Sequence, residues 1–420
     1  MNTKAVRLYG KRDIRLEEFT LPAIKHDEIL ARVVTDSLCM SSYKAVAQGG
    51  DHKRVPNDLA ENPIIIGHEF CGEILEVGEK WGGQFSPGER FVIQPALNYK
   101  GRLDAPGYSF PYIGGNATYV LIPNEVMEMG CLLRYEGDAY FGGSLAEPFS
   151  CVIGTFHAMY HTTPGSYEHQ MGIKEGGSMA ILAGVGPMGL AALDYIIHCD
   201  RKPKTLVVTD IDDARLALAA SRLSVEEAKK NGIMLTYLNT GAVEDPVSTL
   251  LDLNGGVGYD DVLVFAPVAA LVEQADQILG HDGCLNFFAG PPDPKFTARM
   301  NFYNVHYAST HVVGTSAGNT ADLTEALDMV GKGLLNPAIL VTHIGGLNAV
   351  CDATLRLPEI PGGKKLIYNH IEMPLTAISD FAKLGETDPF YKELHKLTEK
   401  TGGLWNAEAE RYLLKERAEK

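Results

Sequence analysis

The sequence predicts an α/β protein in two parts, a β-rich domain followed by a doubly wound parallel sheet. The chain has 420 residues, which is too long for one compact core and indicates two domains. Short β-type runs fill residues 1–150, whereas strands alternate with helices from about 179 to 314. A glycine-rich turn joins the first strand of that second region to a helix.

The β-rich part contains short apolar runs that glycine and proline separate. We expect strands at residues 4–8, 29–35, 71–77, 90–94 and 117–122. In the second part we expect strands at 179–183, 205–209, 261–265, 284–288 and 311–313, with helices at 188–198 and 214–222. The tail from about residue 372 is charged and helical in pattern, so we expect it to pack on the outside.

Charge and composition favour a protein that acts on small molecules. The net charge of −16 disfavours nucleic acid and anionic membranes as partners. The N-terminal residues lack an apolar signal region, and the most apolar long stretch, 179–193, is too short and too interrupted to span a membrane. The seven cysteines are scattered and form no CxxC pair, which indicates a reducing compartment. We therefore expect a cytoplasmic protein.

The glycine-rich turn predicts a dinucleotide site. The run 184–189 reads GVGPMG, a GxGxxG pattern between a strand and a helix, which is the context that gives it meaning. Such a turn brings a pyrophosphate to the helix N-terminus. The next strand ends at Asp210, where an acid binds the ribose hydroxyls and repels a 2′-phosphate, so NAD(H) is favoured over NADP(H). Arg215 weakens that preference slightly.

Four side chains in the first part could hold a metal ion. His68 and Glu69 follow the strand-like run 64–66, Cys39 lies 29 residues before His68, and Glu147 lies where the β-rich part ends. Catalytic zinc takes about three protein ligands and keeps one position open. Each residue alone has a structural reading, as a buried thiol, a core histidine or a turn. Their order ahead of a dinucleotide turn favours a zinc site.

Five motifs in order resemble the zinc-dependent medium-chain dehydrogenases of the alcohol and polyol class. They are CMSS at 39–42, GHE at 67–69, GGNATYV at 114–120, EP at 147–148 and GVGPMG at 184–189. The stretches GCLNFFAGPPD, NFYNVHYAST and GGKKLIY extend the resemblance to members that act on sugar phosphates. The resemblance implies a GroES-like catalytic domain at 1–152, a Rossmann NAD-binding domain at 153–338, and a return to the catalytic domain with a helical extension at 339–420.

The resemblance also implies roles for individual residues. Cys39, His68 and Glu69 fall on zinc-ligand positions, Glu147 on a position that binds zinc or lies beside it, and Ser41 on the proton-relay hydroxyl. The catalytic side chains implied or predicted are Ser41, Lys44 and Glu69. The predicted cofactor residues are Gly184, Gly186, Pro187, Met188, Gly189, Asp210 and Arg215, with Ala289, Gly290, Thr315 and Ser316 in two later loops.

The sequence departs from the family pattern in three places. Ser42 stands where relatives have an aspartate that supports a ligand, so His68 needs another orienting partner. Lys44 stands where many relatives have a relay histidine. Residues 91–115 contain none of the four cysteines that hold a structural zinc in many relatives, so we predict one zinc, not two.

The predicted reaction is hydride transfer between NAD(H) and a sugar or polyol phosphate, with zinc as the Lewis acid. Lys44, His52, Lys53 and Arg54 could bind the phosphate; Lys44 is favoured because it lies close to Cys39, whereas a solvated loop explains His52 and Lys53 better. One alternative is a dehydrogenase of an unphosphorylated polyol or secondary alcohol. Another is a zinc-free relative, either quinone-reductase-like or an NAD(H) sensor. Relatives imply a homo-oligomer, a dimer or a tetramer.

Overall fold

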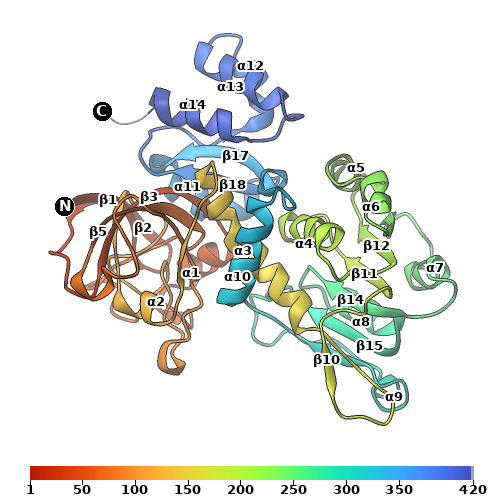
Figure 1. The fold of residues 1–420 in the computed structure, drawn as a ribbon. Coiled ribbons are helices and arrows are strands. Elements are labelled where there is room, and N and C mark those ends of the chain that lie inside the picture. The colour runs from red at the N-terminus through yellow and green to blue at the C-terminus, as the bar shows by residue number, and fades with distance from the viewer. Residues whose placement is uncertain (418–420) are drawn as a thin grey trace. The chain divides into compact units, whose positions relative to one another are not determined.

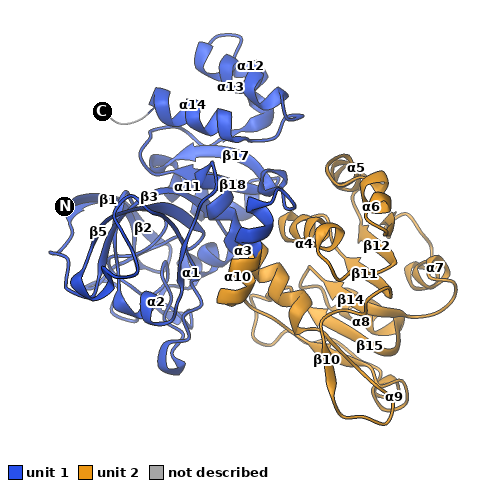
Figure 2. Cartoon of the chain, viewed as in Figure 1, with its two compact units in different colours: residues 1–147, 326–420 blue, residues 148–325 orange. Residues whose placement is uncertain are grey.

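The computed structural model describes residues 1–417 and divides the chain into two compact units (Figures 1 and 2). Unit 1 comprises residues 1–147 and 326–420, and unit 2 comprises residues 148–325. The N-terminal and C-terminal segments thus share one unit, and unit 2 is inserted between them in the chain. Across residues 1–417, every helix falls short of the length and apolar character that crossing a bilayer requires.

Unit 1 is built on an eight-stranded sheet that confirms the predicted β-rich fold. Its strand order is β19-β17-β18-β3-β5-β6-β8, and β7 pairs with β3. The strands are β3 (Ile29–Leu38), β5 (Phe70–Val77), β6 (Arg90–Ile93), β7 (Tyr119–Ile122), β8 (Leu132–Arg134), β17 (Val341–Gly346), β18 (Lys364–Tyr368) and β19 (Thr376–Ala377). A second sheet pairs β1 (Asn2–Gly10) with β2 (Asp13–Thr20) and β4 (Ile64–Ile65).

The pairing of β3 with β18 brings the two ends of unit 1 together at the future site. The two strands are antiparallel, and Lys365 pairs with Leu38, the residue before Cys39. Helix α1 (Met40–Gln48) starts directly after Cys39. The remaining helices that lie wholly in unit 1 are α2 (Asn124–Glu128), α11 (Val350–Leu355), α12 (Phe381–Leu384), α13 (Pro389–Glu399) and α14 (Ala407–Arg417).

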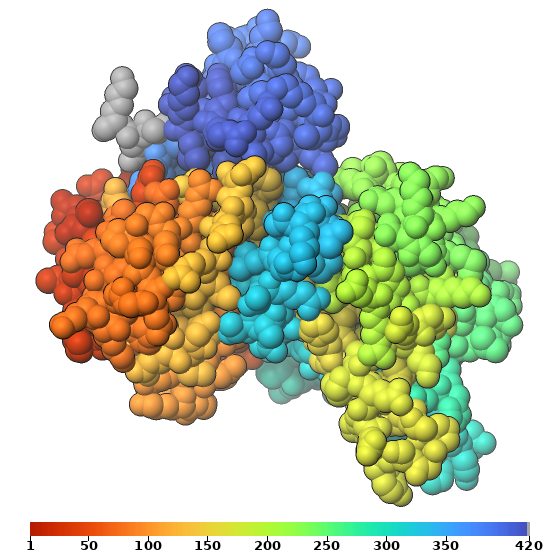
Figure 3. All heavy atoms as spheres, in the orientation of Figure 1, coloured from red at the N-terminus to blue at the C-terminus, as the bar shows by residue number. Residues whose placement is uncertain are grey.

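The C-terminal tail is helical as predicted. We expected it to pack on the outside, but several of its side chains are buried in the core of unit 1. Trp405 and Leu413 are at most 1% exposed, and their cluster includes residues of β17 and β18. Glu410 is buried in α14, where it accepts hydrogen bonds from the backbone of Tyr140 and Phe141. The tail atoms pack closely together in the space-filling view (Figure 3). An amphipathic helix buries its apolar face and exposes its charged face, so a charged tail can still contribute side chains to the core.

Unit 2 contains a six-stranded parallel sheet with the order β13-β12-β11-β14-β15-β16, which confirms the predicted Rossmann-type fold. The strands are β11 (Ser178–Leu182), β12 (Thr205–Asp210), β13 (Met234–Asn239), β14 (Tyr259–Val264), β15 (Leu279–Phe287) and β16 (His311–Val313). The helices are α4 (Pro187–His198), α5 (Asp213–Arg222), α6 (Val225–Lys230), α7 (Pro246–Leu253), α8 (Ala269–Ile278) and α9 (Phe302–Tyr307). The strand order reverses between β11 and β14, where such sheets bind their ligands.

Several elements of the structure were not among those expected from the sequence. Strand β13 was not predicted, because its residues are only half buried and carry a weak apolar pattern. A hairpin of β9 (Tyr160–Thr162) and β10 (His169–Met171) extends from unit 2 (Figure 1). Helix α3 (Tyr140–Ala158) continues through Pro148, so Glu147 lies inside a helix. The last α-helix to be named, α10 (Thr320–Gly331), contains the boundary between unit 2 and the second segment of unit 1.

Candidate metal centre and cofactor site

The Gly67-His68-Glu69 turn is shaped by a buried carboxylate, Asp36. Asp36 accepts hydrogen bonds from the backbone N–H of Glu69 at 3.1 Å and from the amide of Asn116 at 2.6 Å. Gly67 has φ = +94°, and a Cβ there would lie 2.7 Å from Asp36 Oδ2. A Cβ at Gly115 would lie 2.1 Å from Asp36 Oδ1. Both glycines are therefore needed to let the turn close over Asp36.

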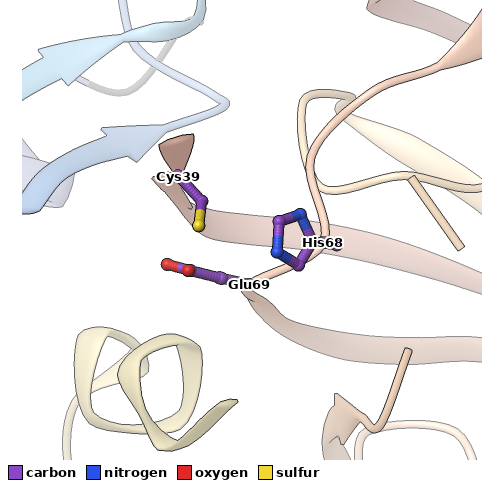
Figure 4. A group of neighbouring side chains, drawn as sticks. All are labelled: Cys39, His68 and Glu69. Atoms are coloured by element: carbon purple, nitrogen blue, oxygen red, sulfur yellow. The ribbon is translucent and has the colours of Figure 1, made fainter. Parts of the chain in front are cut away.

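The turn places three metal-binding groups together. One ligand atom from each of Cys39, His68 and Glu69 lies within 4.8 Å of the others, and Figure 4 shows the three side chains as neighbours, with the Cys39 sulfur directed toward the Glu69 side chain. His68 and Glu69 are at most 5% exposed. A thiolate, an imidazole and a carboxylate form a donor set that suits zinc. The residues that the sequence pointed to thus fit the predicted ion.

His68 is oriented by two serines of the CMSS motif. Ser42 Oγ lies 3.0 Å from Nδ1 of His68, and Ser41 Oγ lies 3.2 Å from Nε2 and 3.0 Å from the sulfur of Cys39. Ser42 therefore occupies, with a hydroxyl, the place of the missing aspartate and provides the partner that His68 needed. Burial lowers the pKa of His68, which favours the neutral imidazole that binds metal ions.

Lys364 is a site residue that the sequence reasoning missed. Its ammonium lies 2.5 Å from Oε1 of Glu69, and Ser37 donates a hydrogen bond to Oε2. Although burial opposes ionisation, Lys364 lowers the pKa of Glu69. Lys364 is only 5% exposed and reaches the site through the β3–β18 pairing. The one signal in the sequence was a lysine pair inside the strand-like run KKLIY.

Glu147 is buried near the same group but lies outside the set of three. Burial raises the pKa of Glu147 to about 7; His68 opposes this rise, and the charges of Glu69 and Cys39 add to it. These interactions place its carboxyl within electrostatic reach of the metal-binding atoms.

Ser41, Lys44 and Tyr108 surround the metal-binding group. Ser41 bridges Cys39 and His68, as described above. Lys44 follows one helical turn later in α1; burial lowers the pKa of its ammonium, and the nearby Cys39 opposes that shift. Tyr108, which the sequence reasoning did not single out, is buried with its hydroxyl 3.3 Å from Nε2 of His68.

In unit 2, the glycine turn has the geometry that a bound pyrophosphate requires. A Cβ at Gly184 would lie 2.7 Å from the side chain of Ile181, and a Cβ at Gly189 would lie 2.3 Å from the carbonyl oxygen of Gly184. A Cβ at Gly186 would meet only Arg215, at 3.5 Å. The first and third glycines therefore allow close packing, whereas the second leaves the backbone open to a ligand at the start of α4.

The other predicted cofactor residues follow the same edge of the parallel sheet. Asp210 ends β12, and its Oδ1 accepts hydrogen bonds from the backbone of Ile211 and Asp212. Arg215 Nη1 lies 3.6 Å from that oxygen. The remaining predicted residues follow β15 or β16, or begin α4: Ala289, Gly290, Thr315, Ser316, Pro187 and Met188. The carboxyl ends of parallel strands meet at one edge, so these residues share the cofactor edge.

A second group of possible metal ligands lies in unit 2 and consists of His161, Asp282 and His311. The nitrogens of His161 lie 3.0 Å from the carbonyl of Asp282 and 3.1 Å from the carboxylate of Asp261. His311 Nε2 lies 3.0 Å from the carbonyl of Tyr160. Although burial opposes it, the hydrogen bond to Asp261 raises the pKa of His161. Internal hydrogen bonds already use these nitrogens, which explains the group without a metal.

Comparisons with known proteins identify the family. The alcohol dehydrogenase GroES-like domain family matches residues 25–129, and the zinc-binding dehydrogenase family matches residues 187–332. The L-sorbose 1-phosphate reductase of Klebsiella pneumoniae is 54% identical over 98% of this chain and 97% of its own length. The mannitol-1-phosphate 5-dehydrogenase of Aliivibrio fischeri is 52% identical over the same shares.

Among solved structures, 2R,3R-butanediol dehydrogenase from Bacillus subtilis has a TM-score of 0.69 at 20% identity, and the match covers 87% of this chain and 99% of that one. This likeness supports the fold. The reductase and the dehydrogenase just named and the two family matches together confirm the resemblance that the motifs indicated. The chain belongs to the zinc-dependent medium-chain dehydrogenases and is an alcohol or polyol dehydrogenase.

Proposed function

We propose that the protein transfers hydride between NAD(H) and a phosphorylated sugar or polyol, with L-sorbose 1-phosphate and D-glucitol 6-phosphate as its preferred pair. The buried group of Cys39, His68 and Glu69 carries the proposal, because its donors suit a Lewis-acidic zinc ion. The names of the Klebsiella reductase and the Aliivibrio dehydrogenase, both above 50% identity, support a phosphate ester as substrate.

Cys39 and His68, together with Glu69 or Glu147, would hold the zinc, which would polarise the ketone and stabilise the alkoxide that hydride transfer creates. Ser41 holds a hydroxyl between Cys39 and His68 and would carry the alcohol proton away from the reacting oxygen. Lys44, half-buried one turn later in α1, would continue that path toward solvent.

Besides its role as a candidate zinc ligand, Glu69 would provide a carboxylate that is held in a fixed position. Its two oxygens are held by Lys364 and Ser37, so its carboxylate is fixed before any ligand arrives. A pre-organised carboxylate costs less reorganisation when charge develops beside it. The NAD(H) preference rests on Asp210, whose carboxylate ends β12 and would repel a 2′-phosphate.

The remaining predictions stay open to test. We propose one zinc per chain, a homo-oligomer and a cytoplasmic location. Unphosphorylated polyols are the second candidate substrates, because butanediol dehydrogenase shares the fold. The zinc-free alternative is disfavoured by the grouping of Cys39, His68 and Glu69.

The test combines metal analysis with turnover. Purified protein should contain one zinc per chain, and it should oxidise NADH with L-sorbose 1-phosphate until a chelator removes the metal. Unphosphorylated L-sorbose and NADPH serve as controls and should give much lower kcat/KM. Full activity without zinc would disprove the Lewis-acid role. Zinc content without turnover of the phosphate ester would reject the substrate and retain the metal site.

A further inference from the structure

A cluster of basic side chains lies around Tyr108, a residue that also contacts the metal-binding group. The Tyr108 ring contacts the ring of His68, with 4.8 Å between centroids. The ring of His52 stacks on Tyr108 at 5.8 Å and 12°, and the guanidinium carbon of Arg54 lies 5.4 Å from the Tyr108 centroid. The same aromatic ring therefore neighbours both these basic groups and a predicted zinc ligand.

Arg54 is half-buried and lacks the partners that such a group normally has. Its Nε is buried without a hydrogen-bond partner, and within residues 1–417 no Asp or Glu oxygen lies within 4.0 Å of its guanidinium. A guanidinium withdrawn from water needs an anion or several acceptors, and its planar fork matches the oxygens of a phosphate. Within residues 1–417 this guanidinium has neither an anion nor acceptors as hydrogen-bond partners.

The surrounding charges are also positive, although the whole chain carries a net charge of −16. Burial lowers the pKa of His52 to about 4, and the charges of Arg54, Lys53 and Lys44 add to that shift. His52 Nδ1 accepts the backbone N–H of Arg54, so the neutral ring carries its proton on Nε2 and can donate it. Local positive charge in an acidic protein attracts an anionic ligand.

The segment is held in place, which distinguishes it from a solvated loop. Ser109 Oγ donates a hydrogen bond to the carbonyl of Arg54 at 2.7 Å. Val55, the next residue, is 7% exposed and belongs to a core cluster of unit 1. Lys53, by contrast, is exposed. The same short stretch thus holds one fixed cation, Arg54, and one solvated cation, Lys53.

We propose that Arg54, assisted by His52 and Lys44, forms the subsite for the phosphate group of the substrate. This proposal rests on the proposed function, because it places a phosphate ester within one ring of the zinc ligand His68. Arg54 binds the phosphate oxygens through its fork, and Tyr108 supports the guanidinium from its ring face. Lys53 takes no part.

The test compares Arg54→Met with Lys53→Met in the zinc-loaded enzyme. Each variant loses one positive charge from the same segment. For Arg54→Met we expect the ratio of kcat/KM for L-sorbose 1-phosphate to kcat/KM for L-sorbose to fall about 100-fold, since two charge-assisted hydrogen bonds are lost. For Lys53→Met the ratio should change by less than about threefold. Equal ratios in the two variants would overturn the subsite.

A second measurement keeps the proposal independent of folding and of the substrate. Arg54→Lys retains the charge and should recover part of the lost ratio. Calorimetry with inorganic phosphate should detect binding to the wild type and to Lys53→Met, and at least tenfold weaker binding to Arg54→Met. If the wild type does not turn over phosphate esters, phosphate binding that depends on Arg54 still supports the subsite. Phosphate binding that ignores Arg54, or no binding at all, would refute it.

Discussion

The metal-binding group of unit 1 and the glycine turn of unit 2 are built in opposite ways. The metal-binding group and its supporting side chains come from residues 36 to 42, 67 to 69, 108, 147 and 364, which distant strands bring together. The glycine turn consists of backbone within residues 184–189. A site of assembled side chains depends on its supporting residues, whereas a site of local backbone depends on the absence of side chains. The predictions below test that difference.

The largest expected effect comes from removing a metal ligand. Cys39→Ala should lose its zinc and reduce kcat/KM at least about 10³-fold, because Lewis-acid catalysis contributes several kcal/mol. Zinc content and turnover of the same preparation provide the measurement. Cys351→Ser is the control, because Cys351 is a free cysteine outside the metal-binding group. A Cys39→Ala protein with full zinc would show that the thiol is not a ligand.

The buried Lys364–Glu69 pair should show how strongly the metal-binding group depends on its support. Lys364→Met leaves a carboxylate buried without its partner, which costs about 3–5 kcal/mol of unfolding free energy. Bound zinc would supply positive charge to Glu69, so we expect a smaller loss in the zinc-loaded protein than after chelation. Urea unfolding under the two conditions provides the measurement.

Lys365→Met is the matched control for that experiment. Lys365 is the neighbouring buried lysine, but its ammonium donates to the carbonyls of Ile360, Pro361 and Gly363 instead of Glu69. Its substitution should destabilise the protein equally with and without zinc. If Lys364→Met also loses the same free energy under both conditions, Lys364 supports the fold and not the metal site.

These two lysines also show what could not be predicted from the sequence. Five strands in each unit and the helices α4 and α5 followed from apolar runs and glycine punctuation, and the Gly184–Gly189 turn followed from spacing, because such signals are local. His68 and Cys39 were recognisable by residue type and order. Lys364, Asp36 and Tyr108 were not, because their roles depend on a strand pairing and on a turn between residues far apart in the chain. Helix α3 was missed because a proline after Glu147 reads locally as a break.

Asp210 should control the cofactor preference. Asp210→Ala removes the carboxylate that would repel a 2′-phosphate and leaves Arg215 to attract it, so the ratio of NADPH to NADH use should rise about 100-fold. Asp213→Asn is the control, since Asp213 begins α5 and bonds Asn239 instead. The measurement is kcat/KM for both cofactors. A ratio that rises equally in both variants would attribute the preference to overall charge and not to Asp210.

Ser42 should have a moderate effect on zinc affinity. Ser42→Ala removes the partner of His68 Nδ1, and loss of such a partner weakens metal binding about 10- to 100-fold. Ser42→Asp should retain or raise the affinity, since it restores the acid that relatives have. Competition with a zinc-binding dye gives the affinity. Ser41→Ala serves as the comparison, and it should reduce turnover more than it reduces zinc affinity. The reverse outcome would make Ser41 the residue that orients His68 and Ser42 the proton relay.

The smallest effects should come from the glycine turn, where adding one methyl group separates folding from binding. A Cβ at Gly189 would lie 2.3 Å from a backbone oxygen, so Gly189→Ala should cost about 1–3 kcal/mol of unfolding free energy. A Cβ at Gly186 has no neighbour closer than 3.5 Å, so Gly186→Ala should fold normally and weaken NADH binding about tenfold. Thermal unfolding and fluorescence titration with NADH measure the two effects. If Gly186→Ala bound NADH as the wild type does, the pyrophosphate would not approach the backbone at Gly186. The glycine turn would then not be a site that depends on the absence of side chains, although its residues were predicted from spacing alone.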